Sequence, residues 1–397
     1  MLLFFGKTVS AGGFENGSTM GMKAASMGGT FTAIGSDASS SFYNPGAMSF
    51  LEFSQLSLGA SFRIGSSSYL SPFSGNSDMD QKMTSHIHLY GVGKLNDQTA
   101  VGISVNTPFC LRTSWKDDWT GRYIIQDSRI SATYIQPTVS YLFGESFSVG
   151  IGPVLALGKT VQTKAIPYNS SSGEVGAELD GNSTGIGANL GLIFKPNEDF
   201  SLGLSYRSSV KMKVKEGDVS FSNVPSSLVD DYPSSLYFST EYTLPSVISL
   251  GAAFNLTRDL LISMDVNYTT WKSFDSLEYS FSNHPELNYG SGKYYENTFA
   301  IRLGGQYQLS EKLQLRGGIA FDQSPVPDKY LSPENPDADK FVFSLGGSVK
   351  IGEHLGLDVA YMLENLKERE VFNEELQFGG NYKSLNNIFG VTLNYEF

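Results

Sequence analysis

Cysteine, charge and long apolar runs are all scarce in this sequence. Its 397 residues include one cysteine, Cys110, and only 17% of them are charged. A single cysteine excludes an internal disulfide framework. The net charge of -12 argues against nucleic acid as a partner, because two negatively charged surfaces repel each other. No apolar run approaches the roughly 18 residues of a membrane-spanning helix, which excludes a helical membrane protein and leaves a β-barrel open.

Aromatic residues and glycine are abundant instead. The sequence holds 27 Phe, 21 Tyr and 42 Gly, and 13% of its residues are aromatic. Low charge together with aromatic, glycine and serine content is typical of many strands that each have one apolar face.

Strict alternation supports this interpretation from residue 53 onward. In the segment 298–309, Phe299, Ile301 and Leu303 alternate with Ala300 and Arg302, so one face is apolar and the other small or polar. We expect strands at 53–66, 83–94, 98–112, 124–143, 146–163, 183–194, 199–214, 236–254, 258–272, 296–309, 312–323, 339–351, 354–366 and 384–397. Several exceed the roughly 9–11 residues that cross a bilayer, so their ends should project beyond it.

The connections between these strands alternate between short and long. Tight turns are expected around 96–97, 144–145, 196–198, 257–258, 310–311 and 352–353. Long polar loops are expected around 67–82, 113–123, 164–182, 215–235, 273–295, 324–338 and 367–383. This sorting predicts an all-β transmembrane antiparallel barrel of 14 strands, with short periplasmic turns and long outer loops. An even strand number places both chain ends in the periplasm.

The residues before the barrel follow neither a helical nor a strand period. We expect residues 1–11 to be the tail of a signal peptide, because Val9-Ser10-Ala11 fits the small-residue cleavage rule. Residues 12–51 are rich in small side chains, and the stretch Gly28 to Leu51 carries one charge, Asp37. They are expected to form a hatch of short helices and irregular chain that plugs the lumen of a barrel formed by residues 52–397.

Five stretches carry a resemblance to a known family. They are 36–45 (SDASSSFYNP), 205–208 (SYRS), 267–271 (NYTTW), 318–327 (GIAFDQSPVP) and the closing strand 389–397 (FGVTLNYEF). They resemble the long-chain fatty-acid transporters of Gram-negative outer membranes, the FadL, OmpP1 and TodX group. The sequence departs from many relatives where Gly46 follows Asn44-Pro45 and where Cys110 replaces a frequent glycine.

The resemblance implies a function as well as a fold. It implies passive uptake of long-chain fatty acids or similar hydrophobic compounds, without a cofactor and without catalysis. Cargo would be captured by outer loops, pass to a lumen pocket, and leave laterally at a kink in the third strand after the hatch rearranges. Partners would be the cargo, outer-membrane lipids and lipopolysaccharide, and the barrel assembly machinery, which would read the closing strand ending in Phe397. The protein would be a monomer.

Candidate gating residues lie in the hatch and in the third strand. In the hatch they are Asp37, Phe42, Asn44, Pro45 and Gly46. In the third strand they are Asn106, Pro108 and Phe109, because proline cannot donate to a strand ladder and so breaks it locally. A harmless bulge near the loop end is the alternative. We expect the turn at Asn44-Pro45-Gly46 to lie near Pro108.

Candidate ligand residues in the lumen are cationic or acidic. Strand parity turns Arg63, Arg207, Arg302, Arg316, Asp265, Asp322 and Asp358 inward, most of them in ion pairs that fill a polar interior. Lys159, Arg207 and Asp322 are the ligand candidates. Lys159 corresponds to a head-group lysine that the resemblance implies, although its parity points it outward unless a bulge intervenes.

Other chemistry finds little support. His86 and His88 share one strand face, but a third ligand is out of sequence reach, so no metal site is expected. Asp117-Asp118-Trp119 and Glu368-Arg369-Glu370 are expected to be solvated loop residues. No nucleophile motif or phosphate-binding loop appears. The alternatives to fatty-acid uptake are a channel for aromatic hydrocarbons or haem, an outer-membrane enzyme, and a hydrophilic porin.

Overall fold

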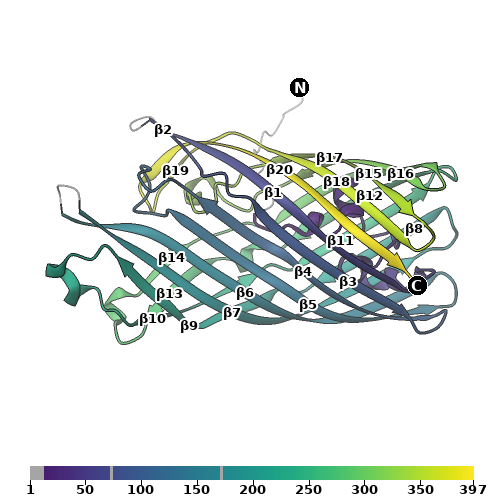
Figure 1. The fold of residues 1–397 in the computed structure, drawn as a ribbon, viewed down its shortest axis with the longest axis horizontal. Helices are drawn as coiled ribbons and strands as arrows, with labels where there is room; N and C mark the ends of the chain where they lie inside the picture. Colours follow the sequence, from purple (N-terminus) through teal and green to yellow (C-terminus); the bar gives the residue numbers. More distant parts are fainter. Residues whose placement is uncertain (1–12, 72–74, 170–172) are drawn as a thin grey trace, which may run out of the picture.

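Fourteen antiparallel wall strands close into one barrel in the computed structural model (Figure 1), which describes residues 13–71, 75–169 and 173–397. The barrel closes because β1 (Gln55–Ser71) pairs on one side with β3 (Thr84–Lys94) and on the other with β20 (Phe378–Glu396). The predicted fold class and strand number are therefore confirmed.

Some wall strands are continuous and others are bent. The remaining continuous strands are β4 (Thr99–Ser114), β5 (Asp127–Phe143), β6 (Phe147–Asn169), β7 (Gly173–Phe194), β16 (Leu313–Asp322) and β17 (Lys340–Ile351). The bent ones consist of two segments each: β8 (Phe200–Arg207) and β9 (Val210–Ser222), β10 (Leu236–Leu244) and β11 (Val247–Asn255), β12 (Leu260–Thr269) and β13 (Ser276–Phe281), β14 (Tyr289–Gly292) and β15 (Thr298–Ser310), β18 (Leu355–Leu366) and β19 (Arg369–Asn373). The short β2 (Gly75–Asp78) lies along β1.

Several predicted long loops are strands instead. The segment 164–182 was expected to be a loop, but β6 and β7 pair as far as Asn169 and Gly173. The reason is that the alternation continues there, with Val175, Ala177 and Leu179 buried on the inner face. Parts of 215–235, 273–295 and 367–383 are likewise strand. Figure 1 shows these strands projecting at the long-loop end of the barrel.

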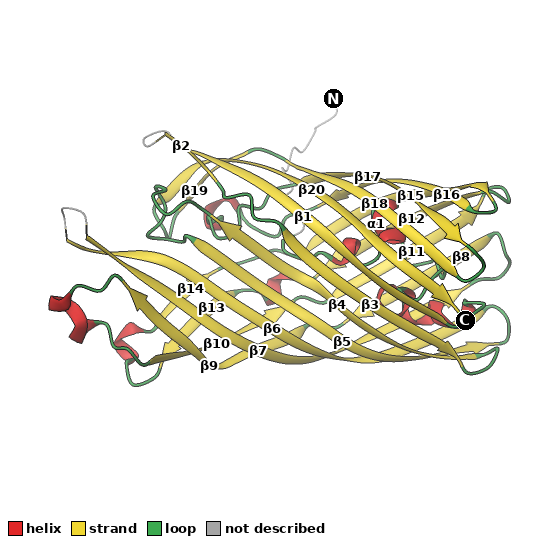
Figure 2. Cartoon of the chain, viewed as in Figure 1, coloured by secondary structure: helices red, strands yellow, loops and turns green. Residues whose placement is uncertain are grey.

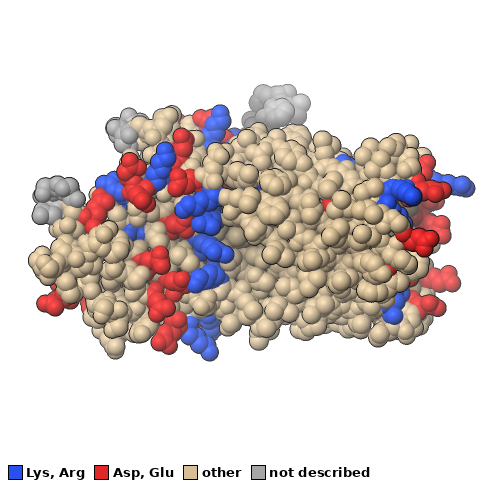
Figure 3. Space-filling model, in the orientation of Figure 1, with Lys and Arg blue, Asp and Glu red and all other residues tan. Residues whose placement is uncertain are grey.

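The outer and inner faces of the wall differ as the alternation predicts. Leu58, Ile301 and Leu345 are at least 49% exposed on the outside, whereas Ser61 and Ser104 are buried on the inside. Figure 3 shows a broad band without charge around the middle of the visible face, bordered by Lys, Arg, Asp and Glu at both ends. Within the described ranges, no helix is long and apolar enough to cross a membrane, a finding that does not bear on strands.

The segment 13–51, called the N-terminal segment below, lies inside the barrel (Figure 2). It contains η1 (Gly17–Thr19), α1 (Met22–Ser26), α2 (Ser40–Tyr43) and η2 (Pro45–Phe50). The predicted signal-peptide tail, 1–11, lies outside the described residues. The other short helices are in connections: η3 (Ser226–Asp231), η4 (Trp271–Ser273), η5 (Pro285–Leu287) and η6 (Asp328–Tyr330).

Candidate functional site

Glycines on the inner face of the wall let the N-terminal segment approach the strands closely. A Cβ on Gly191 of β7 would lie 2.0 Å from the Asn44 side-chain oxygen and 2.7 Å from the Pro45 nitrogen. A Cβ on Gly318 of β16 would lie 2.2 Å from the carbonyl carbon of Met27. Contacts this short exclude any side chain, so glycine at these two positions makes room for the segment.

Polar wall side chains hold the backbone of the segment in place. Asp265 of β12 accepts hydrogen bonds from the backbone N–H groups of Phe31 and Thr32, both at 2.9 Å. Gln136 of β5 donates to the carbonyl of Ser41 at 2.7 Å, and Asn189 of β7 donates to that of Phe42 at 2.8 Å. These bonds satisfy backbone groups that neither helix nor sheet would satisfy.

The wall is incomplete between β3 and β4. These two strands pair only from Lys94 with Ala100 to Leu89 with Val105. Beyond that point the residues 84–88 of β3 have no described partner on β4, and β4 shifts register against β5 between Asn106 and Phe109. Contacts close the opening again at the long-loop end, where the Asp80 N–H donates to the Ser114 carbonyl at 2.8 Å. We call this interruption the wall gap.

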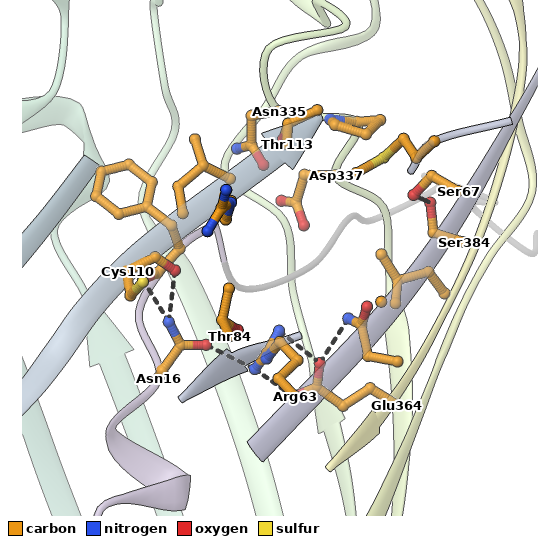
Figure 4. A pocket seen from close by; sticks show the side chains of 18 of the residues that line it. Asn16, Arg63, Ser67, Thr84, Cys110, Thr113, Asn335, Asp337, Glu364 and Ser384 are labelled. Carbon is orange, nitrogen blue, oxygen red and sulfur yellow. Dashed lines mark hydrogen bonds and ion pairs between the residues drawn. The ribbon is translucent and has the colours of Figure 1, made fainter. Parts of the chain in front are cut away.

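The N-terminal segment takes the place of β3 along the inner side of the wall gap. The N–H of Asn16 donates to the carbonyl of Pro108 at 2.7 Å, and the N–H of Cys110 donates to the carbonyl of Phe14 at 3.1 Å. The Asn16 side chain also donates to the Cys110 carbonyl at 2.8 Å (Figure 4). The backbone groups of β4 that have no partner on β3 are thus hydrogen-bonded to residues 14–16.

Aromatic rings surround Phe14 at this position. Its ring centroid lies 4.9 Å from Trp271, 5.3 Å from Phe274 and 6.2 Å from Phe109, each in an edge-on arrangement. Trp271 and Phe274 come from the bend between β12 and β13, which turns into the lumen and buries both side chains. The lumen on the long-loop side of the segment is therefore lined by aromatic side chains.

A row of alternating charges crosses the inner wall from β15 to β1. Arg302 pairs with Asp322 at 3.2 Å, and Asp322 lies 3.7 Å from Lys340. Glu364 continues the row, 3.6 Å from Lys340 and 3.1 Å from Arg63. Both ends of the row contact the N-terminal segment.

One of these end contacts, that of Arg63, connects the row to the wall gap. Arg302 donates to the carbonyl of Gly28 at 3.2 Å, and Arg63 donates to the side-chain oxygen of Asn16 at 2.6 Å. A cavity of about 100 Å³ lies between Arg63, Asn16, Cys110 and Asp337 (Figure 4). The inward orientation of these charged side chains agrees with strand parity, as does the burial of the Arg316–Asp358 pair.

Asp337 joins the start of the N-terminal segment to the loop between β16 and β17. It accepts a hydrogen bond from the N–H of Gly13 at 3.1 Å and another from the Ser324 hydroxyl. Burial raises the pKa of the Asp337 carboxyl group to about 7, against the opposing effects of the Ser324 bond, Lys340 and Arg369. The carboxyl group therefore titrates near neutral pH.

The predicted hatch residues lie in the segment, but not where one expectation placed them. Asn44 donates to the carbonyl of Leu192 at 3.0 Å, and Pro45 and Gly46 pack against Gly150 and Gly191. The expectation that this turn lies near Pro108 is wrong, because the β6 and β7 glycines provide its seat and residues 14–16 contact Pro108 instead.

Other candidates are buried inside the barrel. Asp37 lies 3.6 Å from the Lys23 ammonium, and the Phe42 ring stacks under the guanidinium of Arg207 at 4.1 Å. Arg207 also lies 3.5 Å from the Glu15 carboxylate, and Asn106 is fully buried.

Lys159 lies on the outer face of β6 and pairs with Asp180. As a lumen candidate it is therefore wrong, because β5 and β6 pair without a bulge around it.

Two expectations about loop residues are also wrong. Arg369 is buried and donates to the carbonyls of Val326 and Asp337, both at 2.9 Å, so it fastens the loop between β16 and β17. Trp119 is buried too and stacks on Trp115 at 4.4 Å. His86 and His88 are buried on β3, and no group of three metal-ligating side chains occurs among the described residues.

The sequence has no local signal for the contacts that residues 14–16 and Trp271 make at the gap. Residues 14–16 are too short a run to show a period. Trp271 is notable in the sequence only as part of the stretch 267–271 that resembles the family. Their contacts join positions more than 90 residues apart, so no local pattern reports them.

Comparisons with known proteins agree on one family. The family model of the outer membrane protein transport proteins (OMPP1/FadL/TodX) matches residues 2–397. Outer membrane protein P1 of Haemophilus influenzae is 25% identical over 351 residues, covering 78% of this chain and 74% of that protein. The long-chain fatty acid transport protein of Escherichia coli K12 is 23% identical over 347 residues, covering 78% and 76%.

Several solved structures share the fold. A Pseudomonas aeruginosa FadL homologue superposes with a TM-score of 0.83 at 20% identity, covering 98% of this chain and all of that one. The Pseudomonas putida toluene transporter TodX superposes with a TM-score of 0.73 at 16% identity, covering 97% and 99%.

Proposed function

The chain belongs to the OMPP1/FadL/TodX family of outer membrane transport proteins, and from this premise we propose that it carries long-chain fatty acids or similar amphipathic compounds by passive diffusion. It is an outer-membrane β-barrel of a transporter family for hydrophobic compounds. The cargo and the route are the proposal. We also propose that it performs transport without catalysis and without a cofactor.

The wall gap is the observation that carries this proposal. Cargo would enter among the long loops, pass the aromatic rings around Phe14, and reach the gap where residues 14–16 now pair with β4. Movement of the N-terminal segment away from Pro108 would free that edge and open a lateral exit into the bilayer. The segment 12–51 would then act as a hatch, with Asp37, Phe42, Asn44, Pro45 and Gly46 holding its seated form.

The lumen offers both parts of the site that an amphipathic acid requires. Aromatic side chains suit an apolar tail, and a cation such as Arg63 or Arg207 suits a carboxylate. Both arginines already have acidic partners, Glu364 and Glu15. A cargo carboxylate would therefore compete with these internal carboxylates.

Uptake of labelled oleate tests the proposal. Cells that express the protein should accumulate oleate faster than cells with an empty vector, with assembly of the barrel checked by its heat-dependent gel migration. Uptake equal to that of the vector control, in cells with assembled barrel, would refute fatty-acid transport.

Aromatic hydrocarbons are the second candidate cargo. The edge-on rings around Phe14 would accept a small aromatic molecule equally well, and TodX, which shares the fold, is described as a toluene transporter. Saturable uptake of labelled toluene without oleate uptake would favour this candidate.

Other partners follow from the membrane setting. We propose that the long loops face the cell exterior and that outer-membrane lipids and lipopolysaccharide surround the uncharged band. The barrel assembly machinery would recognise the closing strand of residues 389–397 during insertion. The protein would be inserted as a monomer.

A further inference from the structure

A group of cations lies on the outer side of the wall gap. Lys82 and Arg112 lie 3.6 and 3.9 Å from the same carboxylate, that of Asp127. Arg129 stands directly opposite Arg112 in the pairing of β4 with β5. We call Lys82, Arg112 and Arg129 the cationic rim.

The strand pairing turns the two arginines of the rim away from the lumen. Their neighbours Thr113 and Ile130 are buried on the inner face, so Arg112 and Arg129 occupy the opposite face. The Arg112 side chain is 30% exposed, and Arg129 is exposed. Both are therefore accessible from outside the barrel.

The rim has more positive than negative charge. Among the described residues Arg129 has no ion pair, and Asp127 serves both Lys82 and Arg112. Like charges directly opposite on paired strands are destabilising. An external anion bound between Arg112 and Arg129 would relieve this repulsion.

The rim and the lumen share the cavity at the wall gap. Its charged lining comprises the cations Arg63, Lys82, Arg112 and Lys340 and the acids Asp80, Asp337 and Glu364. The inner cations already have carboxylate partners, since Glu364 lies within 4 Å of both Arg63 and Lys340. The unbalanced positive charge is thus at the outer edge, where Arg129 adds to Arg112 and Lys82.

We propose that the cationic rim binds the carboxylate of an amphipathic cargo at the membrane side of the wall gap. This makes the protein selective for anionic amphiphiles over uncharged hydrocarbons. A carboxylate fits between two guanidinium groups with hydrogen bonds from each, while the apolar tail stays in the gap or the bilayer. The inference rests on the proposed function, because it assumes that cargo crosses the wall at this gap.

The test compares two cargoes that share one tail. Initial uptake of labelled oleate and of labelled oleyl alcohol is measured for wild type and for Arg112→Gln with Arg129→Gln. We expect oleate uptake to fall by roughly two- to fivefold for each lost contact, the range typical of exposed charge pairs, and oleyl alcohol uptake to stay unchanged. The double variant Arg112→Lys with Arg129→Lys should keep most of the oleate rate.

A matched control removes cations from the same outer face but away from the gap. Lys211→Gln with Lys213→Gln, on β9, should change neither rate. An equal fall for both cargoes in the rim variant, or unchanged oleate uptake with assembled barrel, would overturn the inference. Wild-type barrels that take up neither cargo would instead refute the proposed function.

Discussion

Phe14 lies edge-on against Trp271, with their ring centroids 4.9 Å apart, and the backbone of Phe14 bonds to β4 beside Pro108. One residue thus joins two irregularities of the wall, the break in β4 and the inward bend between β12 and β13. Removing its ring should loosen the segment at both.

Replacing Phe14 with alanine tests this anchor. Losing a packed phenylalanine ring costs about 3–5 kcal/mol in protein cores, so local opening should increase by about a hundredfold or more. Hydrogen exchange at the Asn16 and Cys110 amides should accelerate, as mass spectrometry of the detergent-solubilised barrel would show. Phe53→Ala, at an exposed ring, is the control, and unchanged exchange in F14A would contradict the anchor role.

Neighbouring glycines on β16 offer a matched pair for the seat of the N-terminal segment. Gly318→Ala places a methyl group 2.2 Å from the Met27 carbonyl carbon, whereas Gly317→Ala meets nothing closer than 3.5 Å. We expect Gly318→Ala to displace the segment and to admit small sugars in a liposome-swelling assay. Equal swelling rates for the two variants would show that the seat does not control the leak.

Deleting residues 12–48 removes the material that fills the lumen. The backbone-to-backbone hydrogen bonds of the wall strands do not involve these residues, except at Pro108 and Cys110 of β4. We therefore expect the shortened barrel to assemble and to leak small polar solutes. Sensitivity of cells to a small hydrophilic antibiotic measures the leak. A deleted barrel that assembles and stays impermeable would contradict the plug.

Asp337 should make stability depend on pH. Its pKa of about 7 in the folded protein exceeds the ordinary value of 3.8, so the folded state holds the proton more tightly than the unfolded state. The stability due to the protonated group is fully present below about pH 4 and is lost as pH rises through about 7. Above pH 7, Asp337→Asn should therefore unfold at a higher temperature than wild type.

The comparison is the thermal unfolding midpoint in detergent between pH 5 and pH 8. The wild-type midpoint should fall across this interval, and that of D337N should fall less. Asp118→Asn, in an exposed loop, controls for the loss of one negative charge. Parallel curves for wild type and D337N would show that Asp337 is not the titrating group.

Much of the barrel could be predicted because the alternation that marks each strand depends only on residues close together in the sequence. One face of each strand meets an apolar environment, so apolar and polar side chains alternate along segments such as 298–309. This alternation shows which side chains point outward and which point inward. The same rule turned Arg302 and Asp322 inward and Lys159 outward. The alternation also continues to Asn169 at the end of β6 and from Gly173 at the start of β7, where the polar composition had suggested a loop.

The sequence by itself determined most of the strands and their faces, because each depends on a few consecutive residues, and it placed a proline where β4 shifts register and its pairing breaks. Only the tertiary structure decided what fills the break. Closure of the barrel and seating of the N-terminal segment bring Phe14, Cys110 and Trp271 together from distant parts of the chain. It also placed Asn44, Pro45 and Gly46 against β6 and β7, because the glycines that admit them lie on strands more than 90 residues away.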